Sequence, residues 1–192
     1  MNWLGWVARH RAITPWYLVR YLRFVRLRLC SPHIVCEGLV FLDRGVRVQA
    51  ARGQGRLTLG RWVHVGAGTA VRCHQGTLRV GDKTVFGRLA TVDGYLDIDI
   101  GQSVLVADQV YISDFDHRTN DRSKPIKDQG IAKARVRVED DVWLGVKSTV
   151  VKGVVVGRGS VVGANAVVTR DVAPFSVAVG VPARVVATRG GE

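Results

Sequence analysis

Residues 136–175 read VRVEDDVWLGVKSTVVKGVVVGRGSVVGANAVVTRDVAPF. An aliphatic residue recurs in this stretch at every sixth position, and a compact residue follows four positions after each one. The aliphatic positions are Val138, Leu144, Val150, Val156, Val162 and Val168, and the compact positions are Val142, Ser148, Val154, Ser160, Ala166 and Val172. Neither the 3.6-residue period of an α-helix nor the two-residue period of a flat strand predicts this spacing.

The same period of six recurs upstream in three shorter blocks. They are Leu59, Val65 and Val71; Val80, Phe86 and Val92; and Ile100, Val106 and Ile112. Repeats this short predict a solenoid, in which three sides of about six residues make one triangular coil of about 18. The aliphatic residue of each side points inward and stacks on its equivalents in neighbouring coils. The compact residue lies near a corner, where space and backbone dihedrals are restricted.

These repeats resemble those of the hexapeptide-repeat acyltransferase family from about residue 55 to residue 187. The strongest piece, DDVWLGVKSTVVKGVVVGRGSVVGANAVVTRDVAPFSVAVGVPARVV, is similar to the C-terminal half of the acetyl-CoA-dependent O-acetyltransferases that modify sugars and polysaccharides. The resemblance implies an all-β solenoid, specifically a left-handed parallel β-helix. It also implies a homotrimer with sites between subunits, acetyl-CoA as acyl donor, and no metal. The spacing by itself predicts only a solenoid.

The length and composition limit the organisation of the chain. With 192 residues, one domain plus an appendage is expected. We expect a basic helical segment over 1–30, the β-helix over 31–187 with a loop at 113–135, and a tail at 188–192. The net charge of +12 indicates an anionic partner. The three cysteines form no CxxC, and neither a signal peptide nor a long apolar span is recognisable, so a cytoplasmic location is expected.

The first thirty residues contain six arginines and no acid, interleaved with aromatic side chains. Thr14 followed by Pro15 predicts the start of a helix that runs to about residue 29. Its apolar stripe is expected at Leu18, Tyr21, Leu22, Val25 and Leu29, with Arg20 and Arg23 beside it. This composition is typical of an element that lies on an anionic membrane surface, here the inner face of the plasma membrane. Packing on the protein's own core or on a neighbouring subunit is the alternative. No nucleic-acid-binding module is present, so no nucleic acid is expected as partner.

The longest break in the repeats lies between Ile112 and Val138 and contains one histidine, His117. Transfer of an acyl group from a thioester to a hydroxyl needs a base, and histidine, with an ordinary pKa of about 6.5, suits that role. The SDFDH segment followed by PIKDQG resembles the DHxH…PIxxQ pattern of the sugar-modifying branch. The resemblance implies that His117 is the catalytic base, and that Phe115 stands where many relatives have a first histidine. Asp114 is a candidate to orient His117 or contact the acceptor, and Asp116 is an equal alternative for the orienting role.

The segment Trp143-Leu144-Gly145-Val146 resembles the family's WIG motif. The resemblance implies that its backbone lines the tunnel for the pantetheine arm, and that the N–H of Val146 donates to the oxyanion formed in the reaction. The implied coenzyme contacts are Ala107, Trp143, Gly145, Ala164, Thr169, Arg170 and Arg184. The positive charges of the two arginines complement the negative charges of the coenzyme phosphates. Asp93, about one coil before the loop, is expected near a neighbouring subunit's His117 as a contact for the acceptor hydroxyl. A turn aspartate without that role is the alternative.

Two other classes of function compete with acyl transfer. A γ-type carbonic anhydrase on the same fold needs three histidines meeting at zinc, and His64 and His74 are well separated in sequence from His117. A non-catalytic scaffold explains the repeats but not the histidine loop, the Trp143 segment and the C-terminal arginines together. The expected acceptor is a hydroxyl of a sugar, polysaccharide or glycolipid. A free sugar or an amino acid such as serine stays open as acceptor, and a succinyl or longer acyl group stays open as the transferred group.

Overall fold

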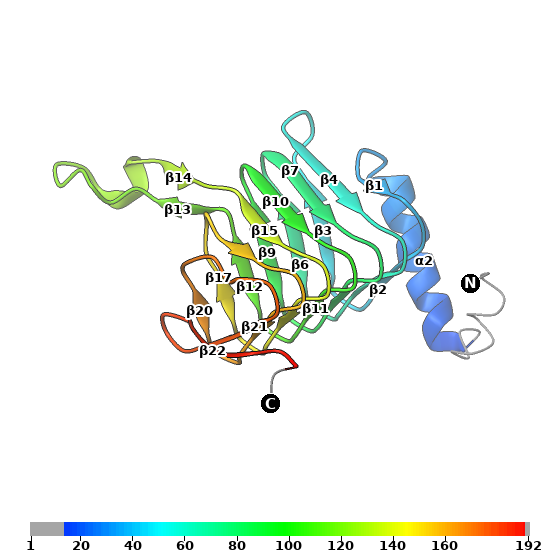
Figure 1. The fold of residues 1–192 in the computed structure, drawn as a ribbon. Coiled ribbons are helices and arrows are strands. Elements are labelled where there is room, and N and C mark those ends of the chain that lie inside the picture. Colours follow the sequence, from blue (N-terminus) through cyan, green and yellow to red (C-terminus); the bar gives the residue numbers. More distant parts are fainter. Residues whose placement is uncertain (1–13, 191–192) are drawn as a thin grey trace.

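The computed structural model describes residues 14–190, which form a three-sided parallel β-solenoid with one long helix across its N-terminal end (Figure 1). Sheet A contains β1 (Val35–Cys36), β4 (Gly55–Leu59), β7 (Gly76–Val80), β10 (Asp97–Ile100), β15 (Val136–Val138) and β18 (Val155–Val156). Sheet B contains β2 (Val40–Leu42), β5 (Val63–Val65), β8 (Val85–Phe86), β11 (Leu105–Val106), β16 (Trp143–Leu144), β19 (Val161–Val162), β21 (Ser176–Val179) and β22 (Arg184–Thr188). Sheet C contains β3 (Arg47–Ala50), β6 (Ala70–Cys73), β9 (Thr91–Gly94), β12 (Tyr111–Ser113), β17 (Thr149–Val150) and β20 (Val167–Val168).

The buried core confirms the reading of the six-residue period. The aliphatic residues of the period stack in register on the neighbouring coils, as in the sheet B column Val106, Leu144 and Val162. The six aliphatic positions from Val138 to Val168 are all 0% exposed, and Ser148, Ser160 and Ala166 at the compact corner positions are equally buried. The solenoid therefore buries one continuous apolar column, with its small residues at the corners.

Tight corners explain the glycines and the left-handed backbone conformations of the repeats. A Cβ atom on Gly145 would lie 2.7 Å from the backbone N of Ala164 in the next coil, so the coils can stack this closely only without a side chain there. Two residues on, Lys147 has a φ of 58°, and the N–H of Ser148 donates to the carbonyl of Gly145 at 3.1 Å. A positive φ at the third position of a four-residue turn is the type II geometry. Val146 thus occupies the second position of a type II turn.

Helix α2 (Pro15–Cys30) confirms the expected helix and its start, with Thr14 as N-cap and Pro15 in the first turn. The predicted apolar stripe, however, is divided between two environments. Tyr21 packs inward with Tyr17 against Phe41 of β2, whereas the other four members of the stripe face outward. Arg20 lies on the inner side, where its Nε donates to Asp43 Oδ1 at 2.7 Å. The helix therefore packs on the solenoid through aromatic residues and arginines. Residues 1–13, including the tryptophans expected in the basic segment, lie outside the described residues.

The outer surfaces of sheets A and B differ in chemistry. On sheet A, Arg79, Asp99 and Arg137 face outward from adjacent strands, and Arg137 Nη2 donates to Asp99 Oδ2 at 3.3 Å. On sheet B, Val85, Leu105 and Trp143 pair across adjacent strands, and each is between 37% and 48% exposed. We call these three residues the sheet B stripe. A charged ladder suits contact with water, whereas a row of exposed apolar side chains marks a surface for contact with another molecule.

Candidate functional site

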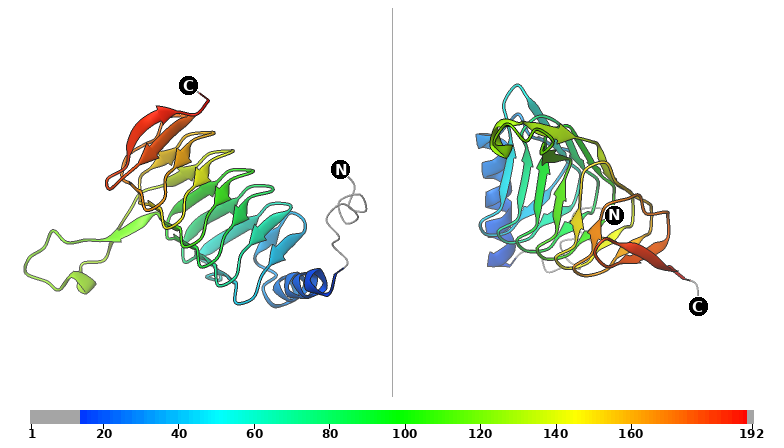
Figure 2. Two further views of the ribbon diagram at one scale, coloured as in Figure 1. Left: turned by 90° about the horizontal axis from the view of Figure 1, so that it is seen from below. Right: turned by 90° about the vertical axis from the view of Figure 1, so that its left-hand side faces the viewer.

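His117 lies on an arm that leaves the solenoid at the corner between sheets C and A. The arm is an antiparallel hairpin of β13 (Phe115–His117) and β14 (Ile131–Lys133), in which His117 is paired with Ile131. Beyond the strands, a short 3₁₀ helix η1 (Ile126–Asp128) and Gln129 shape the tip, where Gln129 Nε2 donates to the carbonyls of Asp121 and Lys124. The arm projects away from the coils, and His117 is exposed (Figure 2). The loop expected at 113–135 is therefore an ordered, protruding hairpin.

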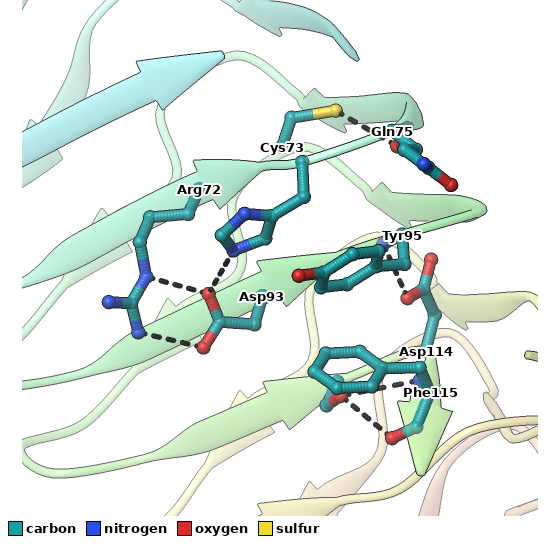
Figure 3. Close-up of polar contacts among 9 residues, drawn as sticks. Arg72, Cys73, Gln75, Asp93, Tyr95, Asp114 and Phe115 are labelled. Carbon is teal, nitrogen blue, oxygen red and sulfur yellow. Dashed lines mark hydrogen bonds and ion pairs between the residues drawn. The ribbon is translucent and has the colours of Figure 1, made fainter. Parts of the chain in front are cut away.

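Asp114 fixes the root of this arm and does not reach His117. Its side chain is fully buried, and its two carboxylate oxygens accept hydrogen bonds from the backbone N–H groups of Tyr95, Leu96 and Asp97 at 2.7–2.8 Å. Figure 3 shows the contact with Tyr95. Because both oxygens are taken by the turn of the preceding coil, Asp114 does not contact the imidazole of His117 in the same chain, and its expected contact with the acceptor stays a prediction. Asp114 ties the start of the arm to the coil before it.

Asp116 makes a different contact, on the surface of the arm. Its carboxylate accepts a hydrogen bond from Lys152 Nζ at 2.7 Å, and its side chain is 60% exposed. Lys152 belongs to the following coil, so the two aspartates hold the base of the arm to the coils on both sides of it. No contact between His117 and either aspartate occurs among the hydrogen bonds of residues 14–190.

Asp93 is held in a compact polar and aromatic cluster at the same corner (Figure 3). Arg72 Nε and Nη2 donate to its two oxygens at 2.7 and 2.8 Å, and His74 Nε2 lies 3.4 Å from its Oδ1. The hydrogen bonds to Asp93 raise the pKa of Arg72 above its ordinary value. The carboxylate of Asp93 is therefore already bound by its neighbours, and its expected contact with the acceptor near the His117 of a neighbouring subunit stays a prediction.

An aromatic stack connects this cluster to the arm. The His74 ring lies against Tyr95 at 4.5 Å between centroids, and Tyr95 meets Phe115 edge-on at 4.5 Å. Lys133 of β14 lies 5.6 Å from the Tyr95 ring centre and donates to Gln75 Oε1 at 2.6 Å. Phe115, at the position of the first histidine of the family pattern, thus packs as an apolar support for the arm.

Sequence reasoning missed Arg72 and His74. A usable signal was present, because Arg72 and Asp93 are 21 residues apart, which is about one coil, and carry opposite charges on neighbouring strands. His74 directly follows strand β6, at the corner column that also contains Tyr95. The pairing could not be predicted because the repeats are irregular in the early coils, so the register of their strands does not follow from the sequence.

The expected pantetheine contacts gather at the corner between sheets B and C. Ala107 and Gly145 occupy equivalent places in consecutive coils, since the N–H of Ala107 donates to Leu144 and that of Gly145 to Val162, and Ala164 lies one residue after the equivalent place in the next coil. We call this set the B–C corner column. Trp143 lies just before it on the outer face of sheet B. The structure thus brings together Ala107, Trp143, Gly145 and Ala164, as expected.

Val146 has an uncommitted backbone N–H in this column, for a structural reason. In the same column, the N–H of Arg88 donates to Asp108 of the next coil at 2.7 Å. The position in the next coil that is equivalent to Val146 is Ala164, and alanine has no side-chain acceptor. Within residues 14–190, the neighbouring N–H groups of Gly145 and Lys147 donate to carbonyls, but no hydrogen bond takes that of Val146. A rigid, exposed N–H of this kind is suited to stabilising an oxyanion.

Comparison with known proteins agrees with this arrangement. Residues 135–170 match a family model described as the hexapeptide repeat of succinyl-transferase. Over 97% of its length the chain is 52% identical to the probable acetyltransferase Rv3034c of Mycobacterium tuberculosis. The chain is similar to the hexapeptide-repeat acetyltransferase family. About half of it (51%) is also 35% identical to the galactoside O-acetyltransferase of Escherichia coli. The matches cover 62% of the mycobacterial relative and 47% of the galactoside enzyme.

A solved structure of an N-acyltransferase has a similar fold. A mutant of AntD, an N-acyltransferase from Bacillus cereus in complex with dTDP and coenzyme A, superposes with a TM-score of 0.72. The match covers 86% of this chain and 88% of AntD at 16% identity. The left-handed parallel β-helix expected from the family resemblance is therefore confirmed as the fold.

The remaining predicted coenzyme contacts lie at the C-terminal end of the solenoid. Thr169 and Arg170 directly follow β20, and Arg184 begins β22, which runs antiparallel to β21. The N–H of Ala183 donates to the carbonyl of Val167 at 2.8 Å, so the start of β22 is held beside the end of β20. All three predicted contacts are exposed. Both arginines therefore lie exposed at this end of the solenoid, where they can bind an anion.

The B–C corner column and His117 belong to different corners of the same chain. Val146 lies where sheet B gives way to sheet C, whereas the arm leaves where sheet C gives way to sheet A. The arm extends away from the coils and not back across sheet C (Figures 1 and 2). One chain therefore presents His117 and the N–H of Val146 at separate edges.

The described part of the chain holds no metal site, and two of its three cysteines are buried. No group of three His, Cys, Asp or Glu side chains gathers in residues 14–190 so as to hold a metal ion. Cys36 and Cys73 are buried, and desolvation raises the pKa of both thiols above the ordinary value. In the same part of the chain, no helix is long and apolar enough to cross a bilayer.

Proposed function

We propose that this chain transfers an acetyl group from acetyl-CoA to a hydroxyl of a carbohydrate acceptor, with His117 as general base. The observation that carries the proposal is the uncommitted N–H of Val146 in a column of small residues, within the segment that resembles the family's coenzyme motif. The names of the relatives support an acetyl donor, and the galactoside enzyme supports a sugar hydroxyl as acceptor. The acceptor class is a sugar, a polysaccharide or a glycolipid.

The proposed reaction is a direct transfer. His117 takes the proton of the acceptor hydroxyl as its oxygen attacks the thioester carbonyl carbon. The N–H of Val146 donates to the oxyanion that forms on the carbonyl oxygen. The C–S bond then breaks, the acetyl group stays on the acceptor oxygen, and the coenzyme A thiolate leaves with the proton that His117 carried. Arg170 and Arg184 bind the coenzyme phosphates through charge-assisted hydrogen bonds.

Assembly as a homotrimer is part of this proposal, because one chain keeps His117 and Val146 apart. The arm of one subunit would bring its histidine to the B–C corner column of the next. Two features support the assembly. A hairpin with two short strands is marginally stable alone and gains from a neighbouring surface. The sheet B stripe offers exposed apolar side chains that a neighbour can cover.

Calorimetric titration with acetyl-CoA tests the donor without knowledge of the acceptor. We expect one binding site per chain and at least about tenfold weaker binding in Arg184→Glu and Arg170→Glu, because each reversal removes a charge-assisted contact. Arg79→Glu is the matched control, since it makes the same charge change on the outer surface of sheet A. A folded trimer that gives no binding heat, or equal binding in all three variants, contradicts the proposed coenzyme site and leaves the scaffold as the better alternative.

Ala164→Asp is predicted to occupy the N–H of Val146 and so to remove it selectively as a hydrogen-bond donor to the oxyanion. By the rule seen at Arg88 and Asp108, an aspartate at position 164 accepts the N–H of Val146. We expect kcat to fall by about 10²–10³, the usual loss when one oxyanion donor is removed. The variant Ala164→Leu adds similar bulk without an acceptor, and assays of both variants at saturating acetyl-CoA separate the two effects. Equal losses in both variants would mean that bulk, and not the N–H, is responsible.

A further inference from the structure

Helix α2 exposes an apolar surface that the solenoid does not cover. Four residues at helical spacing, which we call the α2 stripe, are between 49% and 75% exposed. They are Leu18, Leu22, Val25 and Leu29. The opposite side of the helix packs on the first coil through Tyr17, Tyr21, Phe24 and Leu27. The α2 stripe is therefore unnecessary for holding the helix in place.

A cationic groove lies alongside the α2 stripe. It has a volume of about 430 Å³ and runs between α2 and the corner that joins β2 to β3. Its charged lining consists of Arg23, Arg26, Arg47 and one acid, Asp43. Asp43 is already paired with Arg20 at 2.7 Å, so the groove keeps an excess of positive charge. We call it the arginine groove.

We propose that the N-terminal end of the solenoid binds the surface of an anionic lipid bilayer. The α2 stripe enters the boundary between headgroups and acyl chains, with the helix parallel to the membrane plane. The arginine groove receives the negatively charged headgroups beside it. On the helical wheel Arg26 and Arg23 follow the stripe on one flank, which is the arrangement of an interfacial helix.

Charge decides between a bilayer and a second copy of the chain as the partner. Helix α2 contains four arginines and no acid. Two α2 stripes packed face to face would bring Arg23 and Arg26, which flank the stripe, toward the same residues of the other copy, which is unfavourable. Over residues 14–50 there are six arginines and two acids, so the whole end of the solenoid attracts an anionic surface. Lipid headgroups supply the opposite charge and the apolar layer together.

The proposal concerns a surface separate from the acetyl-transfer site. Helix α2 packs on β2 of the first coil, whereas the His117 arm and the B–C corner column belong to later coils (Figure 1). Membrane binding and acetyl-CoA binding can therefore fail independently. If both hold, an acceptor carried on a lipid would be presented at the membrane that the enzyme occupies.

Flotation of the full-length protein with lipid vesicles tests the inference. The vesicles contain phosphatidylcholine alone or phosphatidylcholine mixed with phosphatidylglycerol. We expect binding to the mixed vesicles that decreases with added salt. The double variant Arg26→Glu/Arg47→Glu should bind at least about tenfold more weakly. Leu22→Gln/Val25→Gln should lose binding to a similar extent, because burial of its apolar side chains supplies the other part of the affinity.

Arg79→Glu, on sheet A, is the control and should float like the wild-type protein. Acetyl-CoA titration of each variant checks that the fold and the coenzyme site are intact. Wild-type protein that fails to float with the anionic vesicles overturns the proposal, as does unchanged flotation in both double variants. A changed oligomer mass in Leu22→Gln/Val25→Gln with unchanged flotation also overturns it, in favour of a second copy of the chain.

Discussion

Replacing His117 by Asn is expected to reduce kcat for acetyl transfer by about 10³-fold, while the affinity for acetyl-CoA stays within about twofold of wild type. The imidazole is proposed to act only on the acceptor proton, so its loss removes an interaction of the transition state and none of the coenzyme. His117 is exposed and is not part of the buried core, so the variant should fold normally. Steady-state rates at saturating acetyl-CoA, with calorimetry on the same samples, measure the two effects.

His33→Asn is the matched control for this experiment. His33 lies before the first strand and contacts the carbonyl of Ala50 at 3.1 Å, remote in the fold from the arm. The same chemical change there should leave kcat unaltered. Transfer that survives in His117→Asn would contradict the proposed base. The nearby His74, held against Asp93 at 3.4 Å, would then be the next candidate for the role.

The fold was predictable because its information is local and repeated. The solenoid requires one inward aliphatic side chain every six residues. Positions such as Leu144 and Val150 therefore show the period in the local sequence, and no information on distant contacts is needed to recognise it. Helix α2 was predictable for the same reason, since Thr14 and Pro15 mark its start. Which side of helix α2 packs on the solenoid was not predictable from the sequence. Tyr21 packs inward and Leu22 outward because Phe41 of the first coil offers an aromatic partner, which is a tertiary effect.

The candidate site was predictable where it follows the repeat, and less so where it depends on contacts between coils. Ala107 and Gly145 fall on the B–C corner column because each directly follows an inward aliphatic residue of the period, Val106 and Leu144. The roles of the aspartates depend on which coil lies above the arm. Asp114 is buried and does not reach His117, whereas Asp116 lies on the surface, and the sequence alone does not distinguish these two environments. Arg72 was missed because its partner Asp93 is a neighbour only once the coils are stacked.

Asp114→Ala is expected to destabilise the protein more than any surface substitution on the arm. The change removes the acceptor for three backbone N–H groups in the turn at Tyr95–Asp97, each bonded at 2.7–2.8 Å to a fully buried carboxylate. Unsatisfied donors in a partly buried turn cost about 1–3 kcal/mol each, and partial access of water lowers the total to roughly 3 kcal/mol. For a chain of this size we expect Tm to fall by about 6–12 °C in a thermal denaturation scan.

Asp116→Ala separates this effect from a general loss of negative charge on the arm. Its ion pair with Lys152 is exposed, so the free energy of unfolding should change by less than about 1 kcal/mol. Asp114→Asn keeps one side-chain acceptor and should fall between the two alanine variants. If Asp114→Ala and Asp116→Ala lower Tm equally, the buried carboxylate is not what anchors the arm. The expected order instead makes Asp114 a positioning residue, because its carboxylate ties the root of the arm that carries His117 to the coil before it.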